Sequence, residues 1–464
     1  MSILSFSYVL FAAAASLISW LIPSKEGSVR RTVTICALNL VFLSFLRARI
    51  LDVAYIIVLC IWTWFAGLTV SRNRTPLSLA LAVSVPAAGL FFFKYAGLFS
   101  AHGVLLPLGI SFYTFKAISY LADIYQNRIE KHSLLPVFAY LTFFPVFMAG
   151  PINRAEPFFN QLNSAWMFSY SDQKKGFLQA MLGGFEKLVI ADQLARGVRV
   201  FLSAELSGWY TVFGVLLYSF QIYADFDAYS NVAIGVSRLI GVKIEKNFDV
   251  PYLSASIISF WRRWHISLSS WLRDYVYIPL GGSRKGEARR IVNVMTSFLI
   301  SGLWHGSTIL FVIWGAGHGV LNLLEGAVGR AMKKRRKKVP VWLLPAGVVL
   351  NFVLVSLLWV FFRSASLAEA MGIFARMSTA SGLPHLSYEA AGITLNELNW
   401  LAVLMGMIIL SDLFRWALKE PLDWLGKQFF VFRWAFYATL LVIAVIFGVY
   451  GPGYHPEDFI YVTF

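Results

Sequence analysis

The stretch IVNVMTSFLISGLWHGSTILFVIWGAGHGVLNLLEGAVGRAM, residues 291 to 332, decides how this part of the chain must fold. It is mostly apolar and lies between the basic pair Arg289 and Arg290 and the run KKRRKK at 333 to 338. A helix needs roughly 20 apolar residues to cross a bilayer core, so this stretch can hold two such helices. Cytoplasmic loops collect Lys and Arg, so both flanks should face the cytoplasm. We therefore predict a helical hairpin with His305 near its turn or deep within it.

The rest of the chain continues this pattern. Its 464 residues are 58% hydrophobic and only 14% charged, with a mean hydropathy of +0.66, which a soluble globular domain does not ordinarily tolerate. Apolar runs near spanning length recur, for example at 3–21, 54–70 and 435–449. We predict an all-α integral membrane protein with about 10 to 13 transmembrane helices, organised as one membrane domain over residues 1–464.

Charge and motif content exclude several functions. The net charge of +16 follows from basic cytoplasmic loops, so it gives no reason to expect a nucleic-acid partner. Cys36 and Cys60 lie in apolar segments, which argues against a disulfide framework. The chain has no HExxH, Walker or GxSxG motif, and we expect neither a metal site nor a tightly bound cofactor. The less hydrophobic segment 152–208 is expected to form amphipathic helices on the membrane surface.

Polar side chains interrupt the apolar stretch SFQIYADFDAYSNVAIG, residues 219 to 235. Charged side chains at the bilayer centre cost about 3 kcal/mol on insertion scales, so such a helix must face a wet cavity or polar partners. Residues four apart share a helix face, which predicts two polar rows. A substrate or proton path and a hydrogen-bonded packing network explain these rows equally well. The candidate binding residues here are Gln221, Asp225, Asp227 and Asn231.

His305 is the strongest candidate for chemistry. An imidazole titrates near neutrality, so it can act as general base toward a hydroxyl, although an intramembrane histidine can also be purely structural. Trp304 and Gly306 flank it and Ser301 precedes it by one turn, which leaves backbone space beside the ring. His318 could form a second polar wall, but its glycine-rich surroundings fit tight helix packing equally well.

A third cluster, FWRRWHISLSSWLRDYVYIPLGGSRKG at residues 260 to 286, mixes tryptophans with Arg262, Arg263, Arg273 and His265. Such a mixture is typical of an interfacial or re-entrant segment, and an aromatic and basic membrane anchor is the simpler interpretation. Arg clusters also bind phosphate. The three arginines are therefore candidates for a cytoplasmic port that binds an anionic acyl donor.

Taken together, these segments resemble the membrane-bound O-acyltransferase family, and within it the bacterial branch that O-acetylates alginate. The resemblance runs in order along nearly the whole chain. It is carried by LPLGISFYTFKAISYLADIY (106–125), FFPVFMAGPINR (143–154), QIYADFDAYSNVAIG (221–235), RWHISLSSWLRDYVYIPLGG (263–282), GLWHG (302–306) and the closing FIYVTF.

The resemblance implies a ring of tilted helices around a thinned core, with re-entrant or interfacial helices. It implies that His305 is the family's invariant catalytic histidine, which either deprotonates a hydroxyl or briefly accepts the acetyl group itself. It also implies that His265 takes the family's second, more cytoplasmic position, which holds a histidine or an asparagine. It also implies a multi-pass protein of the bacterial inner membrane, in contact with lipid, that uses acetyl-CoA or another acyl thioester as donor. A periplasmic SGNH-type acetyltransferase and an exopolysaccharide synthesis machinery are the implied partners.

The acceptor stays open among alginate, acetylated cellulose and cell-wall polymers such as peptidoglycan or teichoic acid. This chain reads DFDAYSN where relatives usually read DFSGYSD, and FIYVTF where they often read FIYFQF, which puts the acceptor in doubt. Two other classes of protein compete with the acyltransferase. A transporter or flippase would use Asp225, Asp227 and His305 as a relay, and a structural scaffold explains the spans but leaves the clustered polar groups unexplained.

Overall fold

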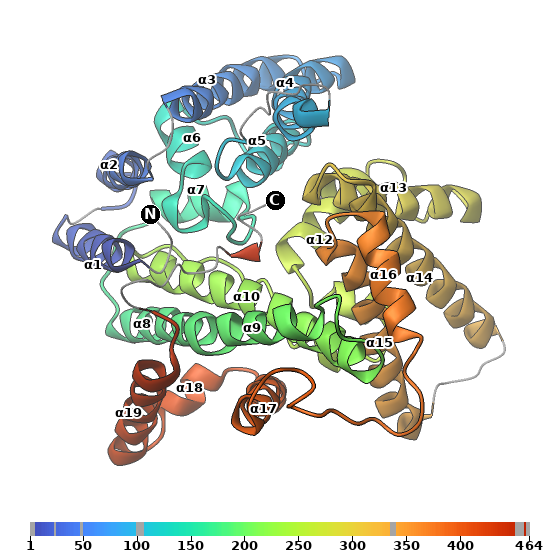
Figure 1. The fold of residues 1–464 in the computed structure, drawn as a ribbon. Helices are drawn as coiled ribbons and strands as arrows, with labels where there is room; N and C mark the ends of the chain where they lie inside the picture. The colour runs from blue at the N-terminus through green and yellow to red at the C-terminus, as the bar shows by residue number, and fades with distance from the viewer. Residues whose placement is uncertain are drawn as a thin grey trace. The chain divides into compact units, whose positions relative to one another are not determined.

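The computed structural model describes residues 5–22, 25–46, 50–98, 106–334, 340–450 and 459–460, and these contain helices and no strand (Figure 1). They form two compact units. The first unit comprises Met1–Leu182 and Tyr229–Lys246, and the second comprises Gly183–Ala228 and Asn247–Ile460. The all-α class predicted from hydropathy is confirmed.

Three helices of the first unit begin with a side-chain cap, from Ser5, Ser28 and Thr75. Thr75 and Ser78 form a reciprocal capping box at the start of α4, which satisfies backbone N–H groups that the first turn leaves open. Buried Arg31 donates to the backbone oxygen of Gly241 at 2.6 Å and lies over the ring of Trp166. The helices are α1 (Phe6–Leu21), α2 (Val29–Phe45), α3 (Ile50–Arg72), α4 (Pro76–Tyr95), α5 (Ile110–Tyr125), α6 (Leu134–Leu141), α7 (Ala155–Asn163) and most of α8 (Tyr170–Phe185).

The second unit contains every candidate site residue except Asn231, which lies in the first unit. The long helix α10 (Trp209–Leu239) gives its first two thirds to this unit and its end to the first unit. Two π-helical turns interrupt the α-helices, at Glu186–Ala191 and Arg273–Tyr277. The other helices are α9 (Asp192–Phe201), α11 (Ile257–Trp261), α12 (Ile266–Leu272), α13 (Glu287–His305), α14 (Ile309–Lys334), α15 (Leu344–Arg363), α16 (Leu367–Met377), α17 (Leu395–Leu418), α18 (Pro421–Gly426) and α19 (Phe430–Phe447).

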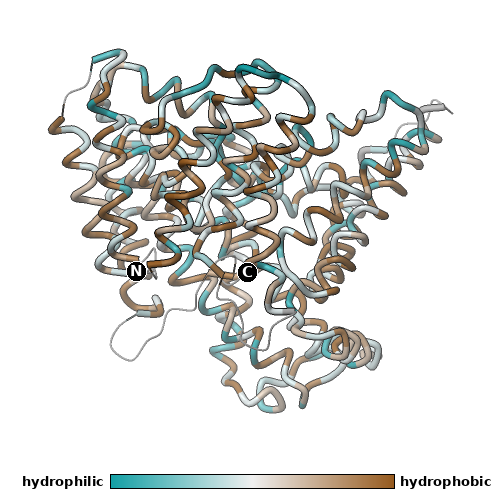
Figure 2. The backbone as a smooth tube through the Cα atoms, turned by 90° about the horizontal axis from the view of Figure 1, so that it is seen from above, coloured by the Kyte–Doolittle hydropathy of each residue, from teal (hydrophilic) through white to brown (hydrophobic). Residues whose placement is uncertain are grey.

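Six helices among the described residues are long and apolar enough to cross a membrane: α3, α4, α14, α15, α17 and α19. Two shorter apolar helical stretches accompany them, at Phe6–Leu21 and Leu134–Val146. Figure 2 shows apolar residues along most of the helices and hydrophilic ones mainly at their ends and connections. No residue of α19 is buried, so its apolar surface is available to lipid. The chain is a multi-pass membrane protein.

The predicted hairpin is confirmed. It consists of α13 and α14, and His305 is the last residue of α13, at the turn. Glycines let the two helices approach closely: a Cβ added to Gly302 would lie 2.3 Å from the backbone oxygen of Phe311. At the other end, Glu287 accepts hydrogen bonds from Arg290 and Arg330, at 2.6 Å each. Both arginines lower the pKa of the Glu287 carboxyl, mainly through the Arg290 hydrogen bond.

Several parts of the chain bear on the remaining predictions from the sequence. The segment 152–208 is helical as expected, and its place at the membrane surface stays a prediction. Residues 335–338 of the run KKRRKK and residues 461–464 of FIYVTF lie outside the described part of the chain. The single membrane domain also stays a prediction.

Candidate functional site

His305 lies inside the second unit with 2% of its surface exposed. Its ring meets Trp304, Trp314 and Phe362 nearly at right angles, with ring centres at 4.8, 5.0 and 5.1 Å. Phe311 lies nearly parallel to it at 6.4 Å. These apolar walls hold the imidazole in one orientation and keep bulk water away from it. A base in such surroundings acts on a hydroxyl without competition from solvent.

The backbone space that Gly306 was expected to leave beside the imidazole is filled by Phe311. A Cβ on Gly306 would lie 2.0 Å from the Phe311 ring, so only glycine lets that ring close over the turn of the hairpin. Trp304 is 5% exposed, and its ring also lies 6.0 Å from the ring of His265. Trp304 therefore lies between His305 and His265, the two candidate catalytic histidines.

His265 occupies a strained position at the start of α12. Its φ of 43° and ψ of 55° place it in the left-handed region, which non-glycine residues adopt at a cost of about 1 to 3 kcal/mol and mainly at functional sites. The ring is 1% exposed and meets Phe226 at 4.8 Å. His265 lies outside the helices long enough to span a membrane. Burial lowers its pKa to about 3, so the ring is neutral near pH 7.

Asn247 determines which nitrogen of His265 carries the proton. Its side-chain oxygen accepts the backbone N–H of Ser267 at 3.2 Å and the Ser267 hydroxyl at 2.8 Å, which identifies that atom as the amide oxygen. The same oxygen lies 3.2 Å from Nδ1 of His265. A carboxamide oxygen only accepts hydrogen bonds, so Nδ1 donates. Nε2 of His265 therefore carries the lone pair.

The three candidate arginines lie on the same segment but differ in their surroundings. Arg262 and Arg273 are exposed and Arg263 is half-buried. The backbone oxygen of Arg263 accepts from Asp249 at 2.9 Å, and the guanidinium of Arg273 pairs with the neighbouring Asp274 at 2.8 Å. Exposed guanidinium groups suit both a phosphate-binding port and a membrane anchor, so the donor port stays a prediction.

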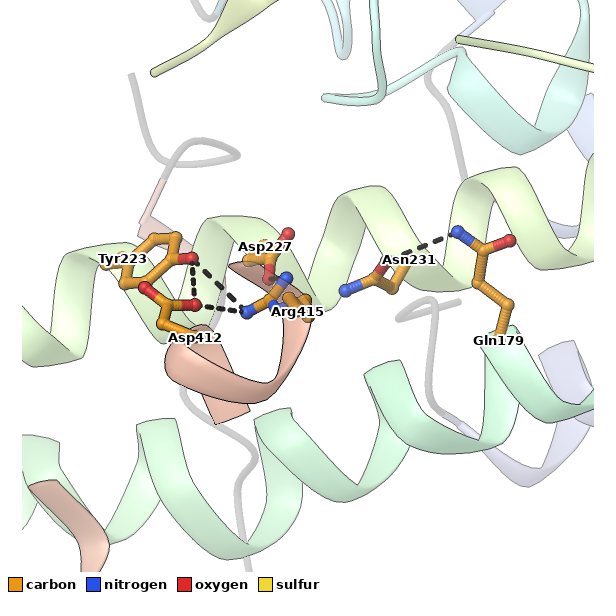
Figure 3. A network of polar contacts seen from close by, with 6 residues as sticks. All are labelled: Gln179, Tyr223, Asp227, Asn231, Asp412 and Arg415. Carbon is orange, nitrogen blue, oxygen red and sulfur yellow. Dashed lines mark hydrogen bonds and ion pairs between the residues drawn. The ribbon is translucent and has the colours of Figure 1, made fainter. Parts of the chain in front are cut away.

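The polar rows of α10 are both present in the helix. In one row, Asp227 accepts from Arg415 of α17 at 2.6 Å. Arg415 also donates to Asp412 at 2.9 Å and to the Tyr223 hydroxyl at 3.2 Å, and that hydroxyl donates to Asp412 at 2.8 Å. Figure 3 shows these side chains converging between α10 and α17. Further along the row, Asn231 accepts from Gln179 of α8 at 3.3 Å.

Asp225, in the other row, belongs to a second buried ion cluster. Lys187, on the first π-helical turn, lies 2.6 Å from Asp225 and 2.8 Å from Asp192, and all three side chains are at most 4% exposed. Asp225 also accepts the backbone N–H of Ile460 at 2.8 Å, and the ring of Phe459 lies 4.4 Å from Nζ of Lys187. Gln221, in the same row, is buried at 9% exposure.

The structure therefore gives both acids of α10 a cationic partner, an arrangement that a packing network explains directly. Their role in binding substrate stays a prediction. Sequence reasoning missed these partners and three other residues, Asp412, Asn247 and Trp314. Asp412 falls inside an apolar run, so the rule that flagged Asp225 also applies to it. No pattern pointed to Asn247, Lys187 or Trp314, because their roles depend on contacts between segments distant in sequence.

Comparison with known proteins identifies the family. The family model described as MBOAT, membrane-bound O-acyltransferase family, matches residues 88–367. A probable alginate O-acetylase of Pseudomonas syringae pv. tomato is 36% identical over 379 residues, covering 76% of this chain and 71% of that protein. A peptidoglycan O-acetyltransferase of Helicobacter pylori is 33% identical over 395 residues, covering 73% and 72%. A teichoic acid D-alanyltransferase of Streptococcus thermophilus is 29% identical over 286 residues, covering 55% and 68%.

The multi-pass helical fold and these similarities together define the class of protein, a membrane enzyme that transfers acyl groups. This chain belongs to the membrane-bound O-acyltransferase family, and it resembles the branch that contains the alginate O-acetylases. It is an O-acyltransferase. Because the chain belongs to this family, we interpret it as an enzyme rather than as a transporter or a scaffold.

Proposed function

We propose that this protein moves acetyl groups from a cytoplasmic thioester, such as acetyl-CoA, across the bacterial inner membrane for O-acetylation of a secreted polysaccharide. The single observation that carries the proposal is the burial of His305 among aromatic rings at the turn of α13 and α14. Relatives named as an alginate O-acetylase and a peptidoglycan O-acetyltransferase support acetyl as the transferred group. Alginate or cellulose is the proposed acceptor.

In the proposed reaction His305 is the general base. It takes the proton from an acceptor hydroxyl while the hydroxyl oxygen attacks the carbonyl carbon of the thioester. The carbon–sulfur bond breaks, and the imidazolium returns the proton to the thiolate, so that an ester and a free thiol leave. Base assistance of this kind accelerates reactions by about 100- to 10,000-fold. We assign His265 to binding or orienting the donor, and Arg262, Arg263 and Arg273 to its phosphate groups.

The proposed partners follow from the chemistry of the acceptor. The chain delivers acetyl groups, and a separate periplasmic SGNH-type acetyltransferase places them on the exopolysaccharide. A cell-wall polymer is the second candidate acceptor, which the 33% identity to a peptidoglycan O-acetyltransferase favours specifically. No cofactor is required beyond the donor substrate itself.

The test is acetyl transfer by purified protein in proteoliposomes. Radiolabelled acetyl-CoA is supplied with an SGNH-type partner and with mannuronate oligosaccharides, cello-oligosaccharides or peptidoglycan fragments, and both thiol release and label on the acceptor are measured. His305→Ala should lower the rate at least about 100-fold, with the helical content unchanged. His385→Ala is the matched control, because His385 is exposed. Transfer by His305→Ala at the parental rate would show that the proposal is wrong.

A further inference from the structure

His318 is the third buried histidine of the second unit, and the proposed reaction does not use it. It lies on α14, one turn after Trp314, and none of its surface is exposed. Aromatic rings from four helices, α11, α13, α14 and α15, enclose it. They belong to Phe260, Trp261, Phe298, Trp314 and Trp359, with ring centres between 5.0 and 6.4 Å from the imidazole.

One hydrogen bond fixes the protonation state of this ring. The indole Nε1 of Trp261 donates to Nδ1 of His318 at 3.2 Å. An indole N–H can only donate, so Nδ1 carries a lone pair and the proton sits on Nε2. His318 is thus a neutral acceptor that holds the indole of Trp261 in one orientation. Trp261 is the last residue of α11, four residues before His265.

The same imidazole also forms one wall around Trp314. The Trp314 ring meets His318 at 5.0 Å and 74°, and it meets His305 at 5.0 Å and 89°. Within the described part of the chain, Nε1 of Trp314 has no hydrogen-bond acceptor. The orientation of this indole therefore depends on packing alone. A change in the ring of His318 reaches His305 through one intervening side chain.

Tight helix packing explains the glycines near His318 but not its hydrogen bond. A Cβ on Gly315 would lie 2.4 Å from the backbone oxygen of Phe298, and one on Gly319 would lie 2.8 Å from the sulfur of Met295. These two contacts set the rotation of α14 against α13. A phenylalanine or leucine at 318 would fill the same space. Only a side chain with an acceptor satisfies the buried indole N–H of Trp261, and a buried donor left without an acceptor destabilises the fold.

We propose that His318 is a positioning residue for acyl transfer. Its ring orients Trp314, whose indole packs against His305. Its Nδ1 orients Trp261, which lies on the segment that carries His265. This inference rests on the proposed role of His305. It gives Nδ1 of His318 a function as hydrogen-bond acceptor, which tight helix packing at the neighbouring glycines does not need.

The test compares variants that separate the ring from the hydrogen bond. His318→Phe keeps a ring and removes the acceptor, Trp261→Phe keeps a ring and removes the donor, and His318→Asn keeps an acceptor close to Nδ1. We expect the first two to lower kcat by about 10- to 100-fold, as small misplacements of reacting groups do, with a smaller change in the KM for acetyl-CoA. The double variant should be no slower than either single one, because both remove the same bond. His318→Asn should recover most of the rate.

Leu404→Ala serves as the control for stability, because Leu404 is fully buried on α17, whereas Trp261 lies on α11 and Trp314 and His318 lie on α14. It should lower the melting temperature and leave kcat unchanged. Parental kcat in folded Trp261→Phe, or additive effects in the double variant, would overturn the inference, and Trp261→Phe tests it even where His318→Phe fails to fold. His305→Ala is measured alongside: if it is inactive while Trp261→Phe has parental kcat, only the role of His318 is wrong.

Discussion

At the scale of single residues, the two histidines nominated from the sequence are held in different ways. His305 is fixed by rings on several sides, whereas His265 is fixed by a hydrogen bond to Asn247 and by a left-handed backbone. The first arrangement gives the imidazole of His305 a defined direction. The second commits Nδ1 as the donor and leaves the lone pair on Nε2. This difference suits a base in one case and an orienting group in the other.

The hydrogen bond between Asn247 and His265 leads to a testable prediction. Asn247→Ala removes the acceptor for His265 and for the backbone N–H of Ser267, and a buried donor left unsatisfied costs about 1 to 3 kcal/mol. We expect a lower melting temperature and a higher KM for acetyl-CoA, because the imidazole can then rotate or change tautomer. Asn247→Asp keeps the acceptor and should keep the donor affinity better. Donor titrations of both variants check this, and equal KM values for Asn247→Ala and the parent would contradict it.

Sequence reasoning succeeded where one residue in its local context was informative. His305 beside a turn in an apolar hairpin could be recognised, since hydropathy predicted both helices and the basic flanks bounded them. Asn247 and Lys187 could not, because an asparagine or a lysine outside an apolar run carries no signal until its partner is known. The left-handed φ of His265 also has no signature in the residues around it.

At the scale of elements, α10 is held by two ion clusters that contact it from different helices. Asp225 is paired by Lys187 and Asp227 by Arg415. A buried ion pair contributes little net stability compared with apolar residues, but removal of one partner leaves an uncompensated charge and costs about 3 to 5 kcal/mol. Each cluster therefore makes the position of α10 conditional on another element, the first π-helical turn in one case and α17 in the other.

Substitution at Lys187 distinguishes packing from a proton path. Lys187→Met leaves Asp192 and Asp225 buried without their cation, so we expect a loss of about 3 to 5 kcal/mol in stability and poor recovery of folded protein. The triple variant K187M/D192N/D225N has no buried charge at this cluster and should regain much of the melting temperature and the activity of each folded molecule. A triple variant that is stable but inactive would favour the proton path over the packing network. Arg196→Met, at an exposed position of α9, is the control.

At the scale of the whole molecule, hydropathy predicted the fold class and most apolar helices. About 10 to 13 spans were expected, and six described helices meet the criteria of length and composition. Helix α10 carries acids that neighbouring helices neutralise, and α13 begins with charged residues. A hydropathy window counts such charges against a span, since it cannot see their partners. The total number of crossings stays a prediction.

The direction of transfer is a property of the whole molecule and gives the last prediction. If the exposed Arg262 and the rest of the basic segment face the cytoplasm, as the positive-inside rule requires, acetyl-CoA is consumed only from that side. Oriented proteoliposomes, sorted by a tag at the basic loop, are given radiolabelled acetyl-CoA on one side and an SGNH-type partner with oligosaccharide on the other. Label should reach the oligosaccharide only when the donor is on the tagged side. Equal labelling from both sides of intact vesicles would mean that the donor and acceptor share one face, and the proposal of transfer across the membrane would be wrong.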